Sequence, residues 1–228
     1  INLLNAGRDC AHSGLIADVI YHEWGHGLDH MTGGIADVAF SEGFSDSVSM
    51  LITKDHILAP NFFLDGQFVR DNEPDKIYPD DRGEVHHEGQ IIASTLWDLY
   101  KTFRSMYGDD EGTDKLANLI LNSIFTATSY KDVYDAFLVI DDNDADLSNG
   151  TPHSCLFNVE FAKHGLVEII DSCRLAKIED FNIDDSSGNN NGVIEPGENV
   201  EIFIAVNNPS NELLTGLKGV LTVPSIEG

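Results

Sequence analysis

Apolar residues recur at helical spacing along most of the first 165 residues of the chain. A first helix is predicted to begin at Ser13, an N-cap residue, and to end at about Asp29. Its apolar face is made by residues three or four positions apart, namely Leu15, Ile16, Val19, Ile20 and Trp24. The same spacing, broken by the acidic residues 109–111, predicts further helices over about residues 41–56, 88–107, 113–127, 130–140 and 151–165.

Beyond about Leu175 the period of the apolar positions changes to two, which is typical of strands. This alternation is carried by Phe181, Ile183, Val193, Val200, Ile202, Ile204 and Val206. About three strands are expected, and they look like the opening strands of an accessory β-sandwich. The predicted fold class is therefore α+β, with a mostly helical domain over residues 1–177 and a short all-β, sandwich-like segment over residues 178–228.

A long connection is predicted over residues 57–85, where three prolines stand among many acids. Long connections are often functional, so we expect this one at the mouth of a cleft. Its phenylalanines, Phe62, Phe63 and Phe68, could line a substrate pocket, although core packing is the simpler expectation.

The chain is strongly acidic, with 13 Lys and Arg against 39 Asp and Glu and a formal net charge of −26. This charge opposes binding to nucleic acid and to anionic membrane surfaces, and no apolar run reaches membrane-spanning length. It favours cation binding, and adaptation to salt or cold would explain it equally well. Because the sequence opens on Ile1 and carries no signal peptide, we expect that upstream residues were removed, as in a secreted protein.

Three cysteines allow at most one disulfide within the chain. Cys155 and Cys173 would close a short loop, and Cys10 with Cys155 is the competing pair. A disulfide would indicate an exported protein, whereas free buried thiols are the alternative.

The strongest chemical signal is the H-E-x-x-H motif formed by His22, Glu23 and His26. Two imidazoles at i and i+4 lie one turn apart on one helix face and can hold one metal ion. Glu23 points beside the pair, where it can take a proton from a metal-activated water. Gly25 and Gly27 each cost the helix about 1 kcal/mol relative to alanine, so we expect another backbone or a substrate to approach closely there.

Glu42 is the expected third metal ligand. It follows His26 by 16 residues, which is room for a helix end, a glycine turn and the start of a second helix. Asp46 lies one turn later on the same face, where it can accept the second ring N–H of a ligand histidine. The alternative is that both are ordinary surface acids.

His86 is a candidate for stabilising an oxyanion, with Asp81 as the carboxylate that orients its ring. His86 follows Asp81 by five residues and stands at the start of an apolar helix. The alternative is that His86 only occupies the start of the helix. The neighbouring His87 is an equal candidate for stabilising the oxyanion.

Three of these segments together, residues 22–27, 31–34 and 42–46, resemble the fungalysin-type metallopeptidases, which are relatives of thermolysin among the gluzincins. Residues 81–92 look like the thermolysin-type segment D-x-x-x-V-H-x-x-x-x-I-I, and the resemblance covers about residues 5–165. It implies a zinc ion on His22, His26 and Glu42, with Glu23 as the base. It also implies transition-state stabilisation by His86, orientation of that ring by Asp81, and a substrate carbonyl bound by Arg70.

The chain departs from that family in two respects. The spacing between His26 and Glu42 is shorter than in thermolysin, and His22 comes so early that most of the family's N-terminal lobe is missing. Since an edge strand of that lobe pairs with the substrate, we expect weak activity of this chain alone on long peptides.

Two loops have spacings that suggest calcium. Alternating carboxylates occur at Asp142, Asp144 and Asp146. An EF-hand-like spacing is provided by Asn189, Asn191 and Glu198. A solvated polar turn is the alternative in both loops.

The sequence as a whole predicts a secreted or cell-surface zinc endopeptidase that acts on protein or peptide substrates. The alternative is a non-catalytic, metal-containing binding or adhesion module of a secreted protein, attached through the β region.

Overall fold

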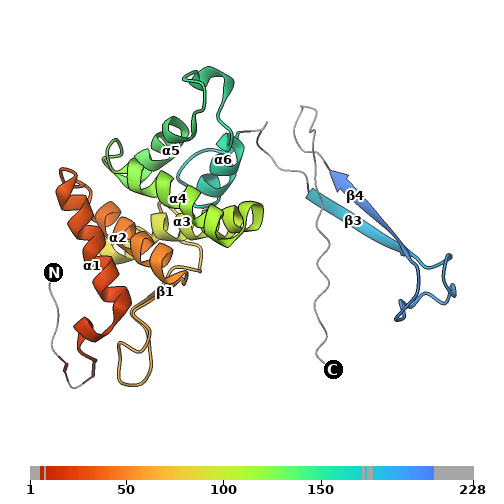
Figure 1. The fold of residues 1–228 in the computed structure, drawn as a ribbon, viewed down its shortest axis with the longest axis horizontal. Coiled ribbons are helices and arrows are strands. Elements are labelled where there is room, and N and C mark those ends of the chain that lie inside the picture. The colour runs from red at the N-terminus through yellow and green to blue at the C-terminus, as the bar shows by residue number, and fades with distance from the viewer. Residues whose placement is uncertain (1–5, 8, 171–172, 174–176, 208–228) are drawn as a thin grey trace. The chain divides into compact units, whose positions relative to one another are not determined.

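The computed structural model describes residues 6–7, 9–170, 173 and 177–207. The chain divides into two units, Ile1–Ile169 and Ile170–Gly228, close to the boundary expected after residue 177 (Figure 1). Helices fill the first unit and a hairpin of two strands characterises the second, so the described chain is a mixed α+β protein.

The described part of the first unit contains six α-helices: α1 (Ala17–Met31), α2 (Val38–Thr53), α3 (Val85–Tyr107), α4 (Asp109–Ser123), α5 (Val133–Asp141) and α6 (Ser154–Lys163). Three single turns of 3-10 helix accompany them: η1 (Ser13–Leu15), η2 (Tyr130–Asp132) and η3 (Leu147–Asn149). Two very short strands, β1 (Ile57–Leu58) and β2 (Arg70–Asp71), pair in antiparallel fashion within the long connection. The periodicity thus identified every α-helix and missed this small pair of strands.

Two predicted helix boundaries were wrong for local reasons. Ser13 does not cap α1 but opens η1, where the Nδ1 atom of His12 accepts a hydrogen bond from the Gly14 N–H at 3.0 Å. The acidic residues 109–111 do not interrupt the helical pattern but form the first turn of α4. Carboxylates are favoured there because the N-terminal end of a helix carries a partial positive charge.

Helix α2 packs on α1 along one side and on α3 along another (Figure 1). Every residue from Ala39 to Met50 is buried, which is typical of a helix covered on all sides. A Cβ atom at Gly43 would collide with the backbone oxygen of Gly89, so these two glycines allow α2 and α3 to pack closely. Phe44 and Ile92 are fully buried beside this crossing, and each contributes roughly 1.5–3 kcal/mol by leaving water.

The described part of the second unit is an antiparallel hairpin of β3 (Lys177–Asp184) and β4 (Glu201–Asn207). The period-two prediction is confirmed for both strands, because Phe181 pairs with Ile204 and Ile183 pairs with Ile202. Val193 lies in the connection between them rather than in a strand. Two strands do not make a sandwich, and residues 177–207 contain no third strand where about three strands were expected.

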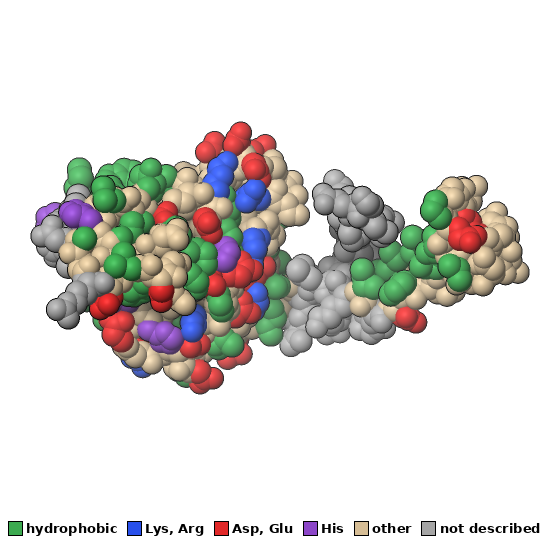
Figure 2. Space-filling model, turned by 90° about the horizontal axis from the view of Figure 1, so that it is seen from below, with side chains coloured by type: hydrophobic (Ala, Val, Ile, Leu, Met, Phe, Trp, Pro, Cys, Tyr) green, Lys and Arg blue, Asp and Glu red, His purple; other side chains and the backbone are tan. Residues whose placement is uncertain are grey.

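Hydrophobic side chains of this hairpin lie at the surface of the described second unit, as Figure 2 shows. Phe181 is 66% exposed and Ile204 is 50% exposed. A hairpin of two strands is marginally stable in water by itself, so this apolar surface adds little to its stability as described.

Cys155 and Cys173 are disulfide-bonded and Cys10 is a free cysteine. Of the alternatives left open by the sequence, this excludes the pairing of Cys10 with Cys155. Among the described helices, none combines the length and the apolar character needed to cross a membrane.

Candidate metal centre

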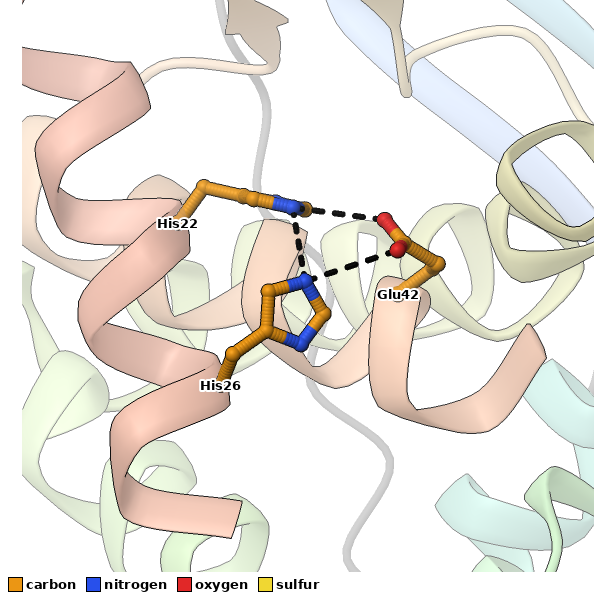
Figure 3. Close-up of side chains that lie close together, drawn as sticks. All are labelled: His22, His26 and Glu42. Atoms are coloured by element: carbon orange, nitrogen blue, oxygen red, sulfur yellow. Dashed lines mark hydrogen bonds and ion pairs between the residues drawn. The ribbon is translucent and has the colours of Figure 1, made fainter. Parts of the chain in front are cut away.

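Helix α1 presents His22 and His26 on one face, one turn apart (Figure 3). Their Nε2 atoms lie 3.1 Å from each other, and the two rings meet at an interplanar angle of 89°. Both lone-pair positions therefore point toward one place beside the helix, as an i, i+4 pair of histidines allows.

Helix α2 brings Glu42 to the same place (Figure 3). Its Oε2 atom lies 3.3 Å from Nε2 of His22, and its Oε1 atom lies 3.4 Å from Nε2 of His26. The approach of α1 to α2 depends on Gly25, where a Cβ atom would lie 2.7 Å from the Cα atom of Ser45. The expected close approach of a backbone is therefore present at Gly25. It is absent at Gly27, where no described residue would lie within 4 Å of a Cβ atom.

The three side chains approach one another about as closely as neighbouring ligands of one metal ion do. Zn–N and Zn–O bonds of about 2.0–2.1 Å place neighbouring ligands of a tetrahedron about 3.3–3.4 Å apart, since the edge is about 1.63 times the bond length. The two Nε2 atoms lie 3.1 Å apart, and each faces a different oxygen of Glu42, His22 facing Oε2 at 3.3 Å and His26 facing Oε1 at 3.4 Å. In addition, Oε2 of Glu42 is buried, and in the described part of the chain it contacts Nε2 of His22 at 3.3 Å and Nη2 of Arg70 at 3.9 Å. His22, His26 and Glu42 thus form a candidate metal-binding cluster.

Asp46 lies where the sequence predicted it, one turn beyond Glu42. Its Oδ1 atom is 2.7 Å from Nδ1 of His22. Arg70 donates two hydrogen bonds to the same carboxylate, from Nε at 2.9 Å and from Nη2 at 2.7 Å. When His22 donates from Nδ1 to Asp46, its Nε2 lone pair is left for a metal ion.

In the metal-free cluster, a proton on His22 offsets part of the negative charge of Glu42 and Asp46. Burial lowers the pKa of His22, but hydrogen bonds to Asp46 and Glu42 outweigh it and raise this pKa to about 9. Burial raises the pKa of Glu42, yet hydrogen bonds from His22 and His26 hold it well below its usual range. Burial likewise raises the pKa of Asp46, and Arg70 with His22 keeps it low. The site therefore attracts positive charge, whether a proton or a cation.

Glu23 lies on α1 beside His22 and lines a cavity of about 220 Å³. The other residues lining this cavity are Ser13, Val19, His22, Leu58, Ala59, Phe62, Val69, Arg70 and His86. Of the three phenylalanines considered above, only Phe62 lines it. Glu23 thus shares an accessible, partly apolar hollow with His22, one of the three residues of the cluster.

His86, in the first turn of α3, lies next to the cluster, with its Nε2 atom 3.5 Å from Oε1 of Glu42. The prediction that Asp81 orients this ring was wrong. Nδ1 of His86 is 2.6 Å from Glu84, whereas Asp81 lies 3.4 Å from Nε2 of His87 and accepts the Ile77 N–H. Glu84 is the N-cap of α3, so its carboxylate already reaches the start of that helix.

Arg70, expected to bind a substrate carbonyl, is held by Asp46 but also lines the cavity. Its Nη2 atom lies 3.9 Å from Oε2 of Glu42. The short β1–β2 pair carries it there, so the long connection does reach the cleft.

The candidate calcium ligands are engaged in closing their own loops. In the first loop, Asp142 accepts the Asp144 N–H at 3.3 Å and Asp144 accepts the Asp146 N–H at 3.0 Å. In the second, Glu198 accepts the Asn189 N–H at 2.7 Å and Asn189 accepts the Asn191 N–H at 3.0 Å. Local hydrogen bonds of this kind are typical of polar turns. Neither loop contributes to the clusters of three His, Cys, Asp or Glu donors found among the described residues.

A second cluster of potential donors is formed by Asp75, Asp98 and His164. Lys163 contacts both carboxylates, and Lys101 lies 2.7 Å from Asp98. Two ammonium groups already neutralise these acids, so the cluster is a network of ion pairs.

Sequence reasoning missed the partner of His26. Nδ1 of this ring lies 3.0 Å from the hydroxyl of Ser41, the residue before Glu42. The only sequence signal for Ser41 is its position immediately before Glu42 on α2.

Comparison of the chain with protein-family models, with curated proteins and with solved structures gives no match.

Proposed function

We propose that the chain is a zinc-dependent endopeptidase of the fungalysin or thermolysin type. The observation that carries the proposal is the convergence of donor atoms of His22, His26 and Glu42 within 4.8 Å of one another, with Glu23 on the adjoining cavity. Imidazole and carboxylate ligands favour zinc over calcium and magnesium, which prefer oxygen ligands alone. Three protein ligands leave one coordination position open, as in catalytic zinc sites.

A zinc ion held there would acidify a water molecule and polarise the carbonyl of a substrate. Glu23 takes the proton of the attacking water and passes it to the leaving amine. His86 stabilises the developing oxyanion by donating from Nε2, while Glu84 fixes the ring through Nδ1. Asp46 and Arg70 keep His22 in the orientation that frees its Nε2 atom.

Protein or peptide chains are the proposed substrates because the cavity combines these polar groups with the apolar side chains of Val19, Leu58 and Phe62. We assign the protein to the outside of the cell, since Cys155 and Cys173 are disulfide-bonded. The β3–β4 hairpin would then begin an accessory β-sandwich attached to the peptidase.

The test compares Glu23→Gln with Glu111→Gln, an exposed control on α4. Zinc content by mass spectrometry and hydrolysis of casein are measured on the same samples. Glu23→Gln should retain zinc and lose roughly 10²–10⁴-fold in turnover, the usual contribution of a general base. The control variant Glu111→Gln should keep both the zinc content and the turnover of the wild type.

Two results would count against the proposal. Full turnover of Glu23→Gln would remove Glu23 from its role as the base. A wild-type chain that holds zinc without cleaving any peptide would instead favour a metal-containing binding module.

A further inference from the structure

We infer that Asp29, acting through the hydroxyl of Ser41, is a positioning residue that sets the orientation of His26 for the metal. The inference rests on the proposed zinc centre. It adds to that centre a second support, which differs in chemistry from the Asp46–His22 pair.

The contacts define a relay from a carboxylate through a hydroxyl to an imidazole. Oγ of Ser41 donates to Oδ2 of Asp29 at 2.6 Å, and the same oxygen lies 3.0 Å from Nδ1 of His26. A hydroxyl has one proton and can accept further bonds. Because Ser41 gives its proton to Asp29, it must accept from His26. His26 therefore carries its hydrogen on Nδ1 and leaves the Nε2 lone pair for the metal.

The relay is buried and connects the two helices that supply the ligands. Asp29 and Ser41 are each less than 9% exposed. Asp29 lies three residues after His26 on α1, and Ser41 immediately precedes Glu42 on α2. A shift of Ser41 would therefore alter the ring of His26 and the carboxylate of Glu42 together.

Asp29 also organises the connection between the two helices. Its Oδ1 atom accepts the N–H of Ile35, and its carbonyl oxygen accepts the N–H of Thr32 at 3.1 Å and of Gly34 at 3.0 Å. Asp29 therefore holds together the short connection between His26 and Glu42, and it also supports the ring of His26 through Ser41.

The two histidine supports differ in charge. The carboxylate of Asp46 is paired with Arg70 at 2.7 Å. Among the described residues, no lysine, arginine or histidine nitrogen lies within ion-pair distance of Asp29, whose two oxygens accept from Ser41 and from Ile35. Within the described chain, the support of His26 therefore lacks a guanidinium partner like the one that Arg70 provides for the support of His22.

The test replaces Ser41 by threonine and by valine, which have the same shape and differ in the hydroxyl. Zinc affinity is measured by competition with a chelator, and the visible spectrum of the Co²⁺-loaded chain reports ligand geometry. Ser41→Val should lower zinc affinity by roughly 10–100-fold and change the spectrum, as expected for loss of a group that orients a ligand. Ser41→Thr should restore both.

Ser47→Ala is the matched control. Ser47 is buried on the same helix, but its hydroxyl bonds the carbonyl of Gly43 within that helix at 2.7 Å. This variant should keep the affinity and the spectrum of the wild type. Equal zinc affinity of the Ser41→Val and Ser41→Thr variants would overturn the inference.

Asp29→Asn tests whether Asp29 acts through Ser41. It should weaken zinc binding in the wild-type background and have no further effect in Ser41→Val, because coupled residues are not additive. Additive losses would show that Asp29 acts independently, and the relay would be abandoned. A wild-type chain that binds no zinc would refute the proposed function itself, so the two failures are distinct.

Discussion

The affinity of the metal-free chain for zinc should rise about tenfold for each pH unit between pH 7 and pH 8.5. The reason is His22, whose pKa is raised to about 9 by hydrogen bonds to Asp46 and Glu42 despite its burial. Zinc needs the neutral ring, so a proton must leave before the metal binds. At pH 7, about two units below this pKa, displacing the proton costs roughly 2.7 kcal/mol, and affinity is reduced about 100-fold.

Loss of the same proton from His22 should also lower the free energy of unfolding of the metal-free chain. A histidine with a raised pKa stabilises the fold fully below its unfolded value, near 6.5, and loses this contribution as the pH rises through about 9. The loss should amount to roughly 3 kcal/mol over that interval. Glu42 and Asp46 have lowered pKa values and titrate far below this range, so they should not alter the slope.

Isothermal titration calorimetry in two buffers with different ionisation enthalpies would count the protons released by zinc. About one proton from His22 is expected at pH 7. Asp46→Asn should release fewer, because the main group that raises the pKa of His22 is removed. Zinc binding that releases no proton, with an affinity independent of pH, would refute this account of the cluster.

Two further predictions concern stability, measured by urea or thermal unfolding. Gly25→Ala should destabilise the chain by roughly 1–3 kcal/mol, because its Cβ would lie 2.7 Å from the backbone of Ser45. Gly27→Ala has open space and should stabilise it by about 0.5–1 kcal/mol, so equal effects would contradict the assigned helix crossing. Burial raises the pKa of Asp98, but His164 and two lysines hold it far below its usual range, so its contribution is present above about pH 4 and lost as the pH falls. Asp98→Asn should cost roughly 3–5 kcal/mol at pH 7 and flatten the loss of stability in acid; an unchanged acid profile would contradict this.

The parts of the fold that the sequence predicted are those controlled by neighbours along the chain. Apolar spacing identified all six described helices, and the i, i+4 spacing placed His22 and His26 on one face. Alternation identified the two described strands of the hairpin. The separation from His26 to Glu42 allowed a third ligand because it fits one short connection between two helices.

What the sequence could not predict depends on the path of longer connections. Asp81 was expected beside His86 from their spacing, but the turn before α3 brings Glu84 to that ring and Asp81 to His87. The calcium spacing at Asp142 and Asp144 stays a prediction, because the pattern fits two structures. Aspartate side chains bond readily to the backbone two residues ahead, so an alternating acidic pattern also describes a turn that closes on itself.

The geometry of the candidate metal centre depends on the crossing of helices α1 and α2. Helix α1 supplies both imidazoles and Asp29, and α2 supplies Glu42 together with both groups that contact the imidazoles, Ser41 and Asp46. These contacts depend on how closely the two helices approach each other. Any change that separates the helices must therefore disturb all three candidate metal ligands together, and a bound ion would oppose that separation. Metal binding and the packing of α1 on α2 should consequently be lost in one cooperative step rather than ligand by ligand.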